Sequence, residues 1–241
     1  MEVREYETMF LVEEGHWWYQ GLHNLAETMI RSEAPIKMLD AGCGTGKLLD
    51  ILADLKPVGF DFSPDAIKLS RKRNAPNLAL ASITDIPFKN ASFDAAVSMD
   101  VLCNLNEADG LKALKDMRAT LKPGGLLLIN LPAFEFMRGD HDRAVHIKRR
   151  FTKKELETML EAAGFKIDMI TYRNIFLFPP AFLVRTFQRF FPAKNPKSDL
   201  GLPPAIVNGF FKNILFFENR LIRLGVTFPF GLSVFCAARK G

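Results

Sequence analysis

Short apolar runs alternate with amphipathic stretches between residues 36 and 174. Runs such as IKMLDAG, PVGFDFS, NLALAS and FDAAVSM, and the segment after the turn KPGG, have the length and composition of buried strands. The stretches between several of them, such as GKLLDILADL, repeat apolar residues at helical spacing. Strands that alternate with helices predict an α/β fold, in which helices cover both faces of a mainly parallel sheet.

Capping residues mark the start of two of these helices. Ser63 followed by Pro64 is typical of a helix N-terminus. Thr152 and Glu155 have the spacing of a capping box, and Gly164 is placed to end that helix. The segment FKIDMITYRN predicts the next strand, and GLSVFCAARK predicts the last.

A segment of different composition, residues 175–230, separates these two strands. Thirteen of the 22 phenylalanines lie at or after Phe176. Helical spacing predicts an apolar face made of Val207, Phe210, Phe211, Ile214, Phe217, Leu221 and Leu224. We therefore expect a single domain over residues 1–241, with a helical lid at 1–34, a core at 35–174 and 231–241, and a Phe-rich helical cap at 175–230.

Composition limits the class of protein. The chain of 241 residues is 48% hydrophobic, enough for one full core, and its net charge of +5 weakly favours anionic partners. Cys43, Cys103 and Cys236 are few and far apart, which fits a reducing compartment. The N-terminus lacks the apolar region of a signal peptide, and no stretch has the length of a membrane span. These features predict a cytoplasmic protein.

The stretch LDAGCGTGK follows the first predicted strand and carries Gly42, Gly44 and Gly46. A glycine-rich turn before a helix lets a nucleotide-like ligand approach the backbone and the free amides of the helix N-terminus. A dinucleotide fingerprint would need its third glycine where Lys47 stands, and Leu48 excludes a Walker A motif. The spacing therefore favours a nucleotide-like ligand other than a dinucleotide.

LDAGCGTG resembles motif I of the class I S-adenosylmethionine-dependent methyltransferases, and GFDFSP, SITDIPF, FDAAVSMDVLCNL and LKPGGLLLINLPAF resemble the motifs that follow it. The resemblance implies a Rossmann-like, seven-stranded, mostly parallel sheet of order 3-2-1-4-5-7-6. It implies S-adenosyl-L-methionine as cofactor and S-adenosyl-L-homocysteine as product. The cofactor-binding residues that it implies are Asp40, Gly42, Cys43, Gly44, Gly46, Asp61, Phe62, Asp85, Ile86 and Met99.

The resemblance also implies a role for each residue. Asp61 would accept hydrogen bonds from both ribose hydroxyls, which suits a carboxylate. Phe62 and Ile86 would pack on the adenine, although both could also be ordinary core residues. Asp85 would accept from the adenine amino group, and Met99 and Asp100 would line the methionine end. Cys43 fits a small packed side chain in the loop better than a nucleophile.

The N-terminal segment EEGHWWYQ contains both tryptophans of the chain. It resembles a bacterial and archaeal subgroup of small methyltransferases that carries an HWW segment and is often encoded beside genes for surface-polysaccharide or lipid-linked sugar assembly. Trp17, Trp18 and Tyr19 are therefore candidate substrate-binding residues in a lid that excludes water. Their alternative role is to pack a helix on the sheet. Gln20 stands where that subgroup often has arginine.

The loop after the fifth predicted strand contains His141, Asp142 and His146. A histidine held by a carboxylate can act as a general base, so His141 or His146 with Asp142 is the predicted catalytic group; a structural role in the loop is the alternative. The histidine spacing does not suit a metal site, and none is predicted. Arg149 and Arg150 are candidate ligands for an acceptor phosphate, or solvated loop residues.

These observations predict a methyltransferase that acts on an oxygen of a small or lipid-linked acceptor, with a saccharide as one option. The Phe-rich cap would form an apolar acceptor pocket or rest on a membrane surface, unless it only buries its own side chains. No basic stripe with interleaved aromatic residues indicates nucleic acid. The rival predictions are a methyltransferase of protein or RNA and a catalytically silent cofactor-binding module.

Overall fold

The computed structural model describes residues 3–73, 75, 77–139, 142, 145–190 and 201–241. Seven strands form one sheet in the order β3-β2-β1-β4-β5-β7-β6. They are β1 (Met38–Ala41), β2 (Val58–Asp61), β3 (Asn77–Leu80), β4 (Phe93–Met99), β5 (Leu121–Pro132), β6 (Phe165–Arg173) and β7 (Ser233–Lys240). Strand β7 is antiparallel to both neighbours, and the other pairs are parallel. The predicted sheet is confirmed.

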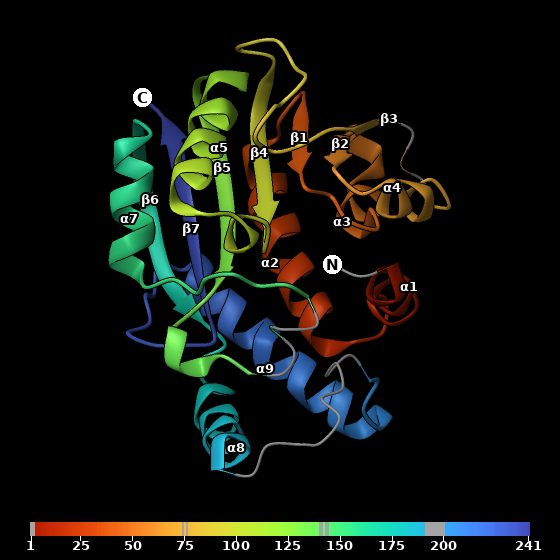
Figure 1. Ribbon diagram of the computed structural model, residues 1–241, viewed down its shortest axis with the longest axis vertical. Helices are drawn as coiled ribbons and strands as arrows, with labels where there is room; N and C mark the ends of the chain where they lie inside the picture. Colours follow the sequence, from red (N-terminus) through yellow and green to blue (C-terminus); the bar gives the residue numbers. More distant parts are fainter. Residues whose placement is uncertain (1–2, 74, 76, 140–141, 143–144, 191–200) are drawn as a thin grey trace.

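Helices cover both faces of this sheet (Figure 1). The helices are α1 (Val3–Val12), α2 (Trp17–Glu33), α3 (Lys47–Ile51), α4 (Pro64–Ser70), α5 (Glu107–Thr120), α7 (Lys153–Ala162), α8 (Phe178–Phe190) and α9 (Ala205–Arg223). On one face, α5 and α7 pack on Leu127 and Ile129 of β5. On the other, α2, α3 and α9 pack on Leu126 and Leu128. This alternation along β5 follows from the two-residue period of a strand.

The predicted caps are present. The Ser63 hydroxyl accepts from the backbone N–H of Ala66 at the start of α4. Thr152 and Glu155 form the complete capping box of α7. Helix α3 is shorter than its apolar pattern predicts, because the chain continues from Ile51 into a 3-10 turn before β2.

Helix α9 forms as predicted, but it buries a different face. Phe210, Phe217 and Leu224 of the predicted apolar face are 63%, 55% and 74% exposed. The buried positions are Leu215, Glu218, Asn219 and Ile222.

Backbone contacts explain why polar residues of α9 turn inward. The Asn219 side-chain amide donates to the carbonyl of Gly21 on α2 over 2.8 Å. The Glu218 carboxylate accepts from the backbone N–H groups of Asn174 and Ile175, just after β6. The Asn219 amide nitrogen and the Glu218 carboxylate thus have backbone partners that the hydrophobic pattern of α9 does not reveal.

The parallel strands end at the edge of the sheet that also carries α1 and the cap helix α8, at the lower end of Figure 1. The strand order reverses at β1, which lies between β2 and β4. Ligands of open α/β sheets bind beyond the carboxyl ends of the strands at such a reversal. The loops after β1, β2 and β4 therefore form the candidate site.

Candidate active site

The loop between β1 and α3 has a backbone that glycine adopts without strain at three positions. The φ angle is +86° at Gly42, +53° at Gly44 and +79° at Gly46. A Cβ at Gly42 would lie 2.4 Å from a methyl carbon of Val101, and a Cβ at Gly46 would lie 2.0 Å from the Ser70 hydroxyl oxygen. Packing of the loop itself thus requires Gly42 and Gly46, whereas Gly44 faces α1.

Asp61 ends β2 beside this loop and is 6% exposed. One carboxylate oxygen accepts from the backbone N–H of Gly44 and the other from that of Ser63, each over 2.9 Å. Burial raises the pKa of Asp61, and these two N–H donors oppose the rise. A carboxylate has about four acceptor positions, so Asp61 keeps capacity for the two hydroxyls of a ribose.

The residues predicted to hold adenine lie beyond the carboxyl ends of β2 and β3. Phe62 follows Asp61 directly, and its ring is 66% exposed. Asp85 is exposed in the loop after β3, and Ile86 is half-buried against the core. The backbone N–H of Ala81 donates to the Asp61 carbonyl, which joins the two loops. An open aromatic ring beside a hydrogen-bonded carboxylate fits an adenosine group.

The residues predicted at the methionine end lie on β1 and β4. Burial, and then the negative charge of Asp61, raise the pKa of Asp40 to about 7. Met99 is half-buried at the end of β4. Cys43 packs in a buried cluster with Leu49, and burial raises the pKa of its thiol. A thiol that stays protonated fits the predicted packing role.

Helix α1 lies over the loop between β1 and α3, residues 42–46, which we call the cofactor loop. The Tyr6 ring is buried against α4, and its hydroxyl lies near Asp61 and Ser63. Burial, followed by the charge of Asp61, raises the pKa of Tyr6 to about 12. The Met9 terminal methyl lies 3.3 Å from the position of a Cβ at Gly44. Of the segment expected to be a lid, α1 covers the loop, whereas α2 packs in the core through Leu25.

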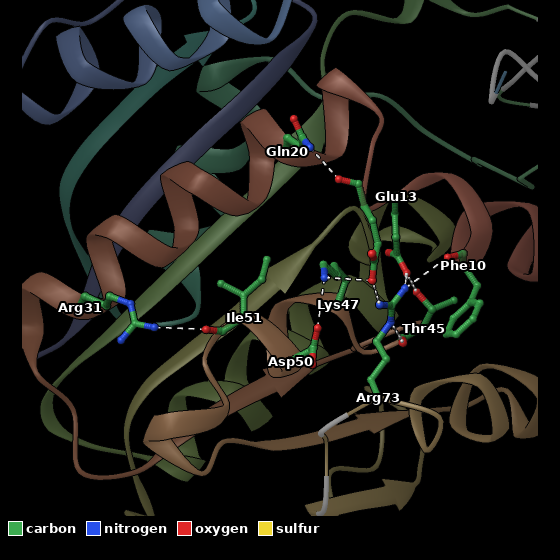
Figure 2. Close-up of polar contacts among 10 residues, drawn as sticks. Phe10, Glu13, Gln20, Arg31, Thr45, Lys47, Asp50, Ile51 and Arg73 are labelled. Carbon is green, nitrogen blue, oxygen red and sulfur yellow. Dashed lines mark hydrogen bonds and ion pairs between the residues drawn. The ribbon is translucent and has the colours of Figure 1, made fainter. Parts of the chain in front are cut away.

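A buried ion pair attaches the end of α1 to the cofactor loop (Figure 2). Arg73 donates to the Glu13 carboxylate over 2.7 Å and to the Thr45 carbonyl over 3.2 Å, and the Thr45 hydroxyl donates to Glu13. Glu14 joins through Arg73 at 2.7 Å and Lys47 at 3.3 Å. Burial raises the pKa of Glu13, and Thr45 and Arg73 oppose this rise. We call Glu13, Thr45 and Arg73 the latch.

The aromatic residues of the HWW segment join α2 to other elements. The backbone N–H of Trp17 donates to the Asn208 side chain over 3.0 Å, and its ring lies 5.3 Å from that of Phe211 on α9. The Trp18 ring meets that of Trp17 edge-on at 5.7 Å. Burial raises the pKa of Tyr19. Trp17 therefore has the packing role, and Tyr19 lies where Glu13 and Asp100 both act on it electrostatically.

The predicted catalytic loop is arranged differently from the prediction in its described part. His141 lies outside the described residues, and His146 is exposed. The Asp142 carboxylate is buried and accepts from Arg150 over 2.8 Å and from the backbone N–H of Gly139. Among the described residues, Asp142 thus pairs with an arginine instead of His146.

Both candidate phosphate-binding arginines have partners within the protein. Arg150 also donates to the Ala133 carbonyl over 2.8 Å. The Arg149 guanidinium lies 4.6 Å from the Phe151 ring and 3.8 Å from a carboxylate oxygen of Glu107. Within the described ranges, no three metal-ligating side chains come together.

Asp100 lies directly after β4, with φ +56°. Its carboxylate accepts from the Asn130 side chain on β5 over 2.9 Å, and its backbone N–H donates to the Asn130 carbonyl over 2.8 Å. Burial raises the pKa of Asp100 to about 6. A carboxyl with this pKa can accept a proton near neutral pH.

The sheet order, the glycine loop and Asp61 define a class I methyltransferase site. A model of the methyltransferase domain matches residues 14–169. "Probable tRNA methyltransferase 9B" from Homo sapiens is 32% identical over 97 residues, 40% of this chain and 21% of that protein. A "Probable S-adenosylmethionine-dependent methyltransferase" from Mycolicibacterium smegmatis is 26% identical over 161 residues, covering 64% of this chain and 62% of that protein.

Solved structures share the whole fold. A SAM-dependent methyltransferase from Thermotoga maritima, described as a possible histamine N-methyltransferase, has a TM-score of 0.64 at 20% identity and covers 99% of this chain and 96% of its own. This chain spans only about a fifth of the human relative. The chain belongs to the methyltransferase domain family. The HWW subgroup stays a prediction.

The residues of the candidate site fit S-adenosylmethionine as the cofactor. Asp61 has acceptor positions free for the ribose, Phe62 offers an open ring, and the positive φ angles keep the loop backbone bare. When bound, S-adenosylmethionine supplies a methyl group on a sulfonium, which is open to attack by a nucleophile. The chain's own residues would position that nucleophile and exclude water.

Sequence reasoning missed the latch and the buried polar residues at the ends of β5 and β6. Glu13 and Arg73 read as ordinary surface charges, and Asn130 lies within an apolar run. The doubled acid in EEGHWW, within the predicted lid, is the only sequence signal for the latch.

Proposed function

We propose that this methyltransferase acts on an oxygen atom of a small or lipid-linked acceptor, including saccharides. The observation that carries the proposal is the hydrogen-bonded Asp100–Asn130 pair at the carboxyl ends of β4 and β5, in which Asn130 is buried and Asp100 is half-buried. Tyr19 lies close enough for Asp100 to raise its pKa, and α1 covers the adjoining loop. A site enclosed in this way suits a small polar group.

Methyl transfer to a hydroxyl needs a base, because the alcohol must lose its proton as the oxygen–carbon bond forms. Asp100 supports this role by its burial and its pKa of about 6. A histidine of the loop after β5, His141 or His146, stays the alternative base. In either case the electron pair of the broken sulfur–methyl bond remains on sulfur.

We test the function with tritiated S-adenosylmethionine and three acceptor pools: a lipid extract, small polar metabolites and total tRNA. Label is expected in the lipid or the small-molecule pool, and Asp100→Asn is expected to reduce it about 100-fold. Asp116→Asn, on the outer face of α5, serves as the control. Label found only in tRNA would contradict the proposal and support RNA methylation, the second candidate, which the name of the human relative suggests.

We further propose that the cap touches a membrane surface while the acceptor is bound. Large apolar side chains of α8 and α9 are exposed, among them Leu183, Ile206 and Phe210. Arg220 and Arg223 are exposed near the end of α9. Apolar residues accompanied by arginine suit an anionic lipid surface. None of the described helices is long and apolar enough to cross a membrane.

Vesicle sedimentation tests this contact. Replacing Leu183, Ile206 and Phe210 together by serine is expected to weaken binding to phosphatidylglycerol vesicles at least about tenfold, because their apolar area no longer leaves water. The control is Ile36→Ser, an equally exposed residue just before β1. Equal sedimentation of the triple variant and the wild type would argue against membrane contact.

A further inference from the structure

Arg173, the last residue of β6, is a buried guanidinium with an open edge. Its side chain is 1% exposed. Nη1 donates to the Asn130 side-chain oxygen over 3.4 Å. Nε and Nη2, which share one edge of the planar group, have no hydrogen-bond partner. Burial removes water from these donors, so an unfilled edge is unfavourable for the protein alone.

The nearby carboxylates act on Arg173 without filling this edge. Glu218 and Asp100 both influence its charge through space, and burial lowers its pKa. The Glu218 oxygens accept from backbone N–H groups after β6, and Asp100 accepts from Asn130. Within the described residues, Arg173 makes no ion pair. The two acids offset its charge and leave its Nε–Nη2 edge available.

Other buried side-chain atoms also lack partners. The side-chain oxygen of Asn104 has no donor, and its amide nitrogen lies 3.5 Å from the Asp100 carbonyl. Buried polar atoms in native proteins are almost always paired. The unpaired Nε–Nη2 edge of Arg173 therefore indicates a polar ligand.

The position of Arg173 separates this ligand from the cofactor loop. Its guanidinium bonds Asn130 on β5, and β5 is two strands from β1 in the sheet. Neighbouring strands are about 4.8 Å apart, so the guanidinium lies roughly 10 Å along the sheet from the glycine loop. It therefore lies on the β5 side of Asp100, away from the glycine loop.

We propose that Arg173 binds an oxyanion of the methyl acceptor, a carboxylate or a phosphate, through its Nε–Nη2 edge; this proposal rests on the proposed function. Two parallel N–H donors match two oxygens of such a group. The acceptor then carries the anionic group at one end and its reacting hydroxyl near Asp100.

Calorimetry with benzoate, phenyl phosphate and neutral benzamide tests this anchor, at constant ionic strength, with and without S-adenosylhomocysteine. The wild type is expected to bind one of the two anions at least about tenfold more tightly than benzamide, and Arg173→Met is expected to lose this preference. The control is Arg239→Met, at a partly exposed ion pair with Asp168 near the end of β7. This variant should keep the preference for the anion. Whichever anion binds more tightly identifies the acceptor group.

Stability provides a second readout. Urea unfolding of Arg173→Met without ligands checks that this variant folds. Arg173→Lys keeps the charge and lacks the planar edge, so it should bind the anion at least about fivefold more weakly even if the methionine variant does not fold. Unchanged anion binding in either variant, or equal binding of benzamide, would overturn the proposal. Failure of the wild type to bind S-adenosylhomocysteine would instead count against the proposed function, and the titrations without it still report on Arg173.

Discussion

Asp61→Asn is expected to raise the dissociation constant for S-adenosylhomocysteine about 100-fold, because it removes charge-assisted hydrogen bonds to the ribose. The substitution preserves the side-chain volume, but an amide has one acceptor oxygen where the carboxylate has two. The remaining oxygen cannot serve both Gly44 and Ser63, which now bond separate oxygens of Asp61. Isothermal titration calorimetry measures the change directly.

The control for this experiment is Asp116→Asn, at a partly exposed ion pair with Lys112 on α5. It alters the charge by the same amount far from the loop and should leave affinity unchanged. Thermal unfolding of both variants checks that the fold is retained. A folded Asp61→Asn protein whose dissociation constant for S-adenosylhomocysteine stays within about threefold of the wild-type value would contradict a role for Asp61 in cofactor binding. Such a change corresponds to less free energy than one hydrogen bond contributes.

Arg73→Met is expected to release α1 from the cofactor loop. The substitution leaves the Glu13 carboxylate, now 3% exposed, without its cationic partner. Removing one member of a buried ion pair costs about 3 kcal/mol. Hydrogen exchange at the α1 amides should therefore accelerate about 100-fold, while exchange in the central strands changes little.

Two further variants isolate the ion pair. Arg71→Met removes an exposed arginine two residues earlier and should not alter exchange in α1. Glu13→Gln combined with Arg73→Met removes both charges, and it should restore most of the protection because no unpaired carboxylate stays buried. Unchanged α1 exchange in Arg73→Met would show that Tyr6 and its apolar neighbours hold the helix without the latch.

The placement of the glycine loop, Asp61 and Ser63 at one edge of the sheet was predictable, because it depends on patterns that are local in the sequence. The glycines stand within five residues of each other, Asp61 ends the next strand, and Ser63 caps the helix that follows. The order of strands and turns then brings these segments to one edge of the sheet. Each of these segments could be predicted from its own residue pattern and from the element that follows it along the chain.

The inward face of α9 was not predictable in the same way. Helical spacing alone selects the face with the most apolar residues, which contains Phe210 and Phe217. The structure exposes that face and buries Glu218 and Asn219, because backbone groups of β6 and α2 supply their partners. A hydrophobic pattern carries no information about such partners.

The loop after β5 shows the same limit for charged residues. Histidines near an aspartate suggest a catalytic pair, and that pattern also fits Asp142. In the described residues, the partner of Asp142 is the Arg150 guanidinium. This group also donates to the Ala133 carbonyl. Which of several nearby groups a buried carboxylate selects depends on the packed geometry.

The sequence by itself determined the class of protein and, through the family resemblance of its contiguous motifs, the strand order and the segments proposed to bind the cofactor. Only the tertiary structure decided which distant side chains meet around these segments. Glu13 and Arg73 are 60 residues apart, and Asn130 and Arg173 are 43 apart. Such pairs form when the sheet and its helices assemble, and no local pattern specifies which buried charge meets which partner or is left with an open edge.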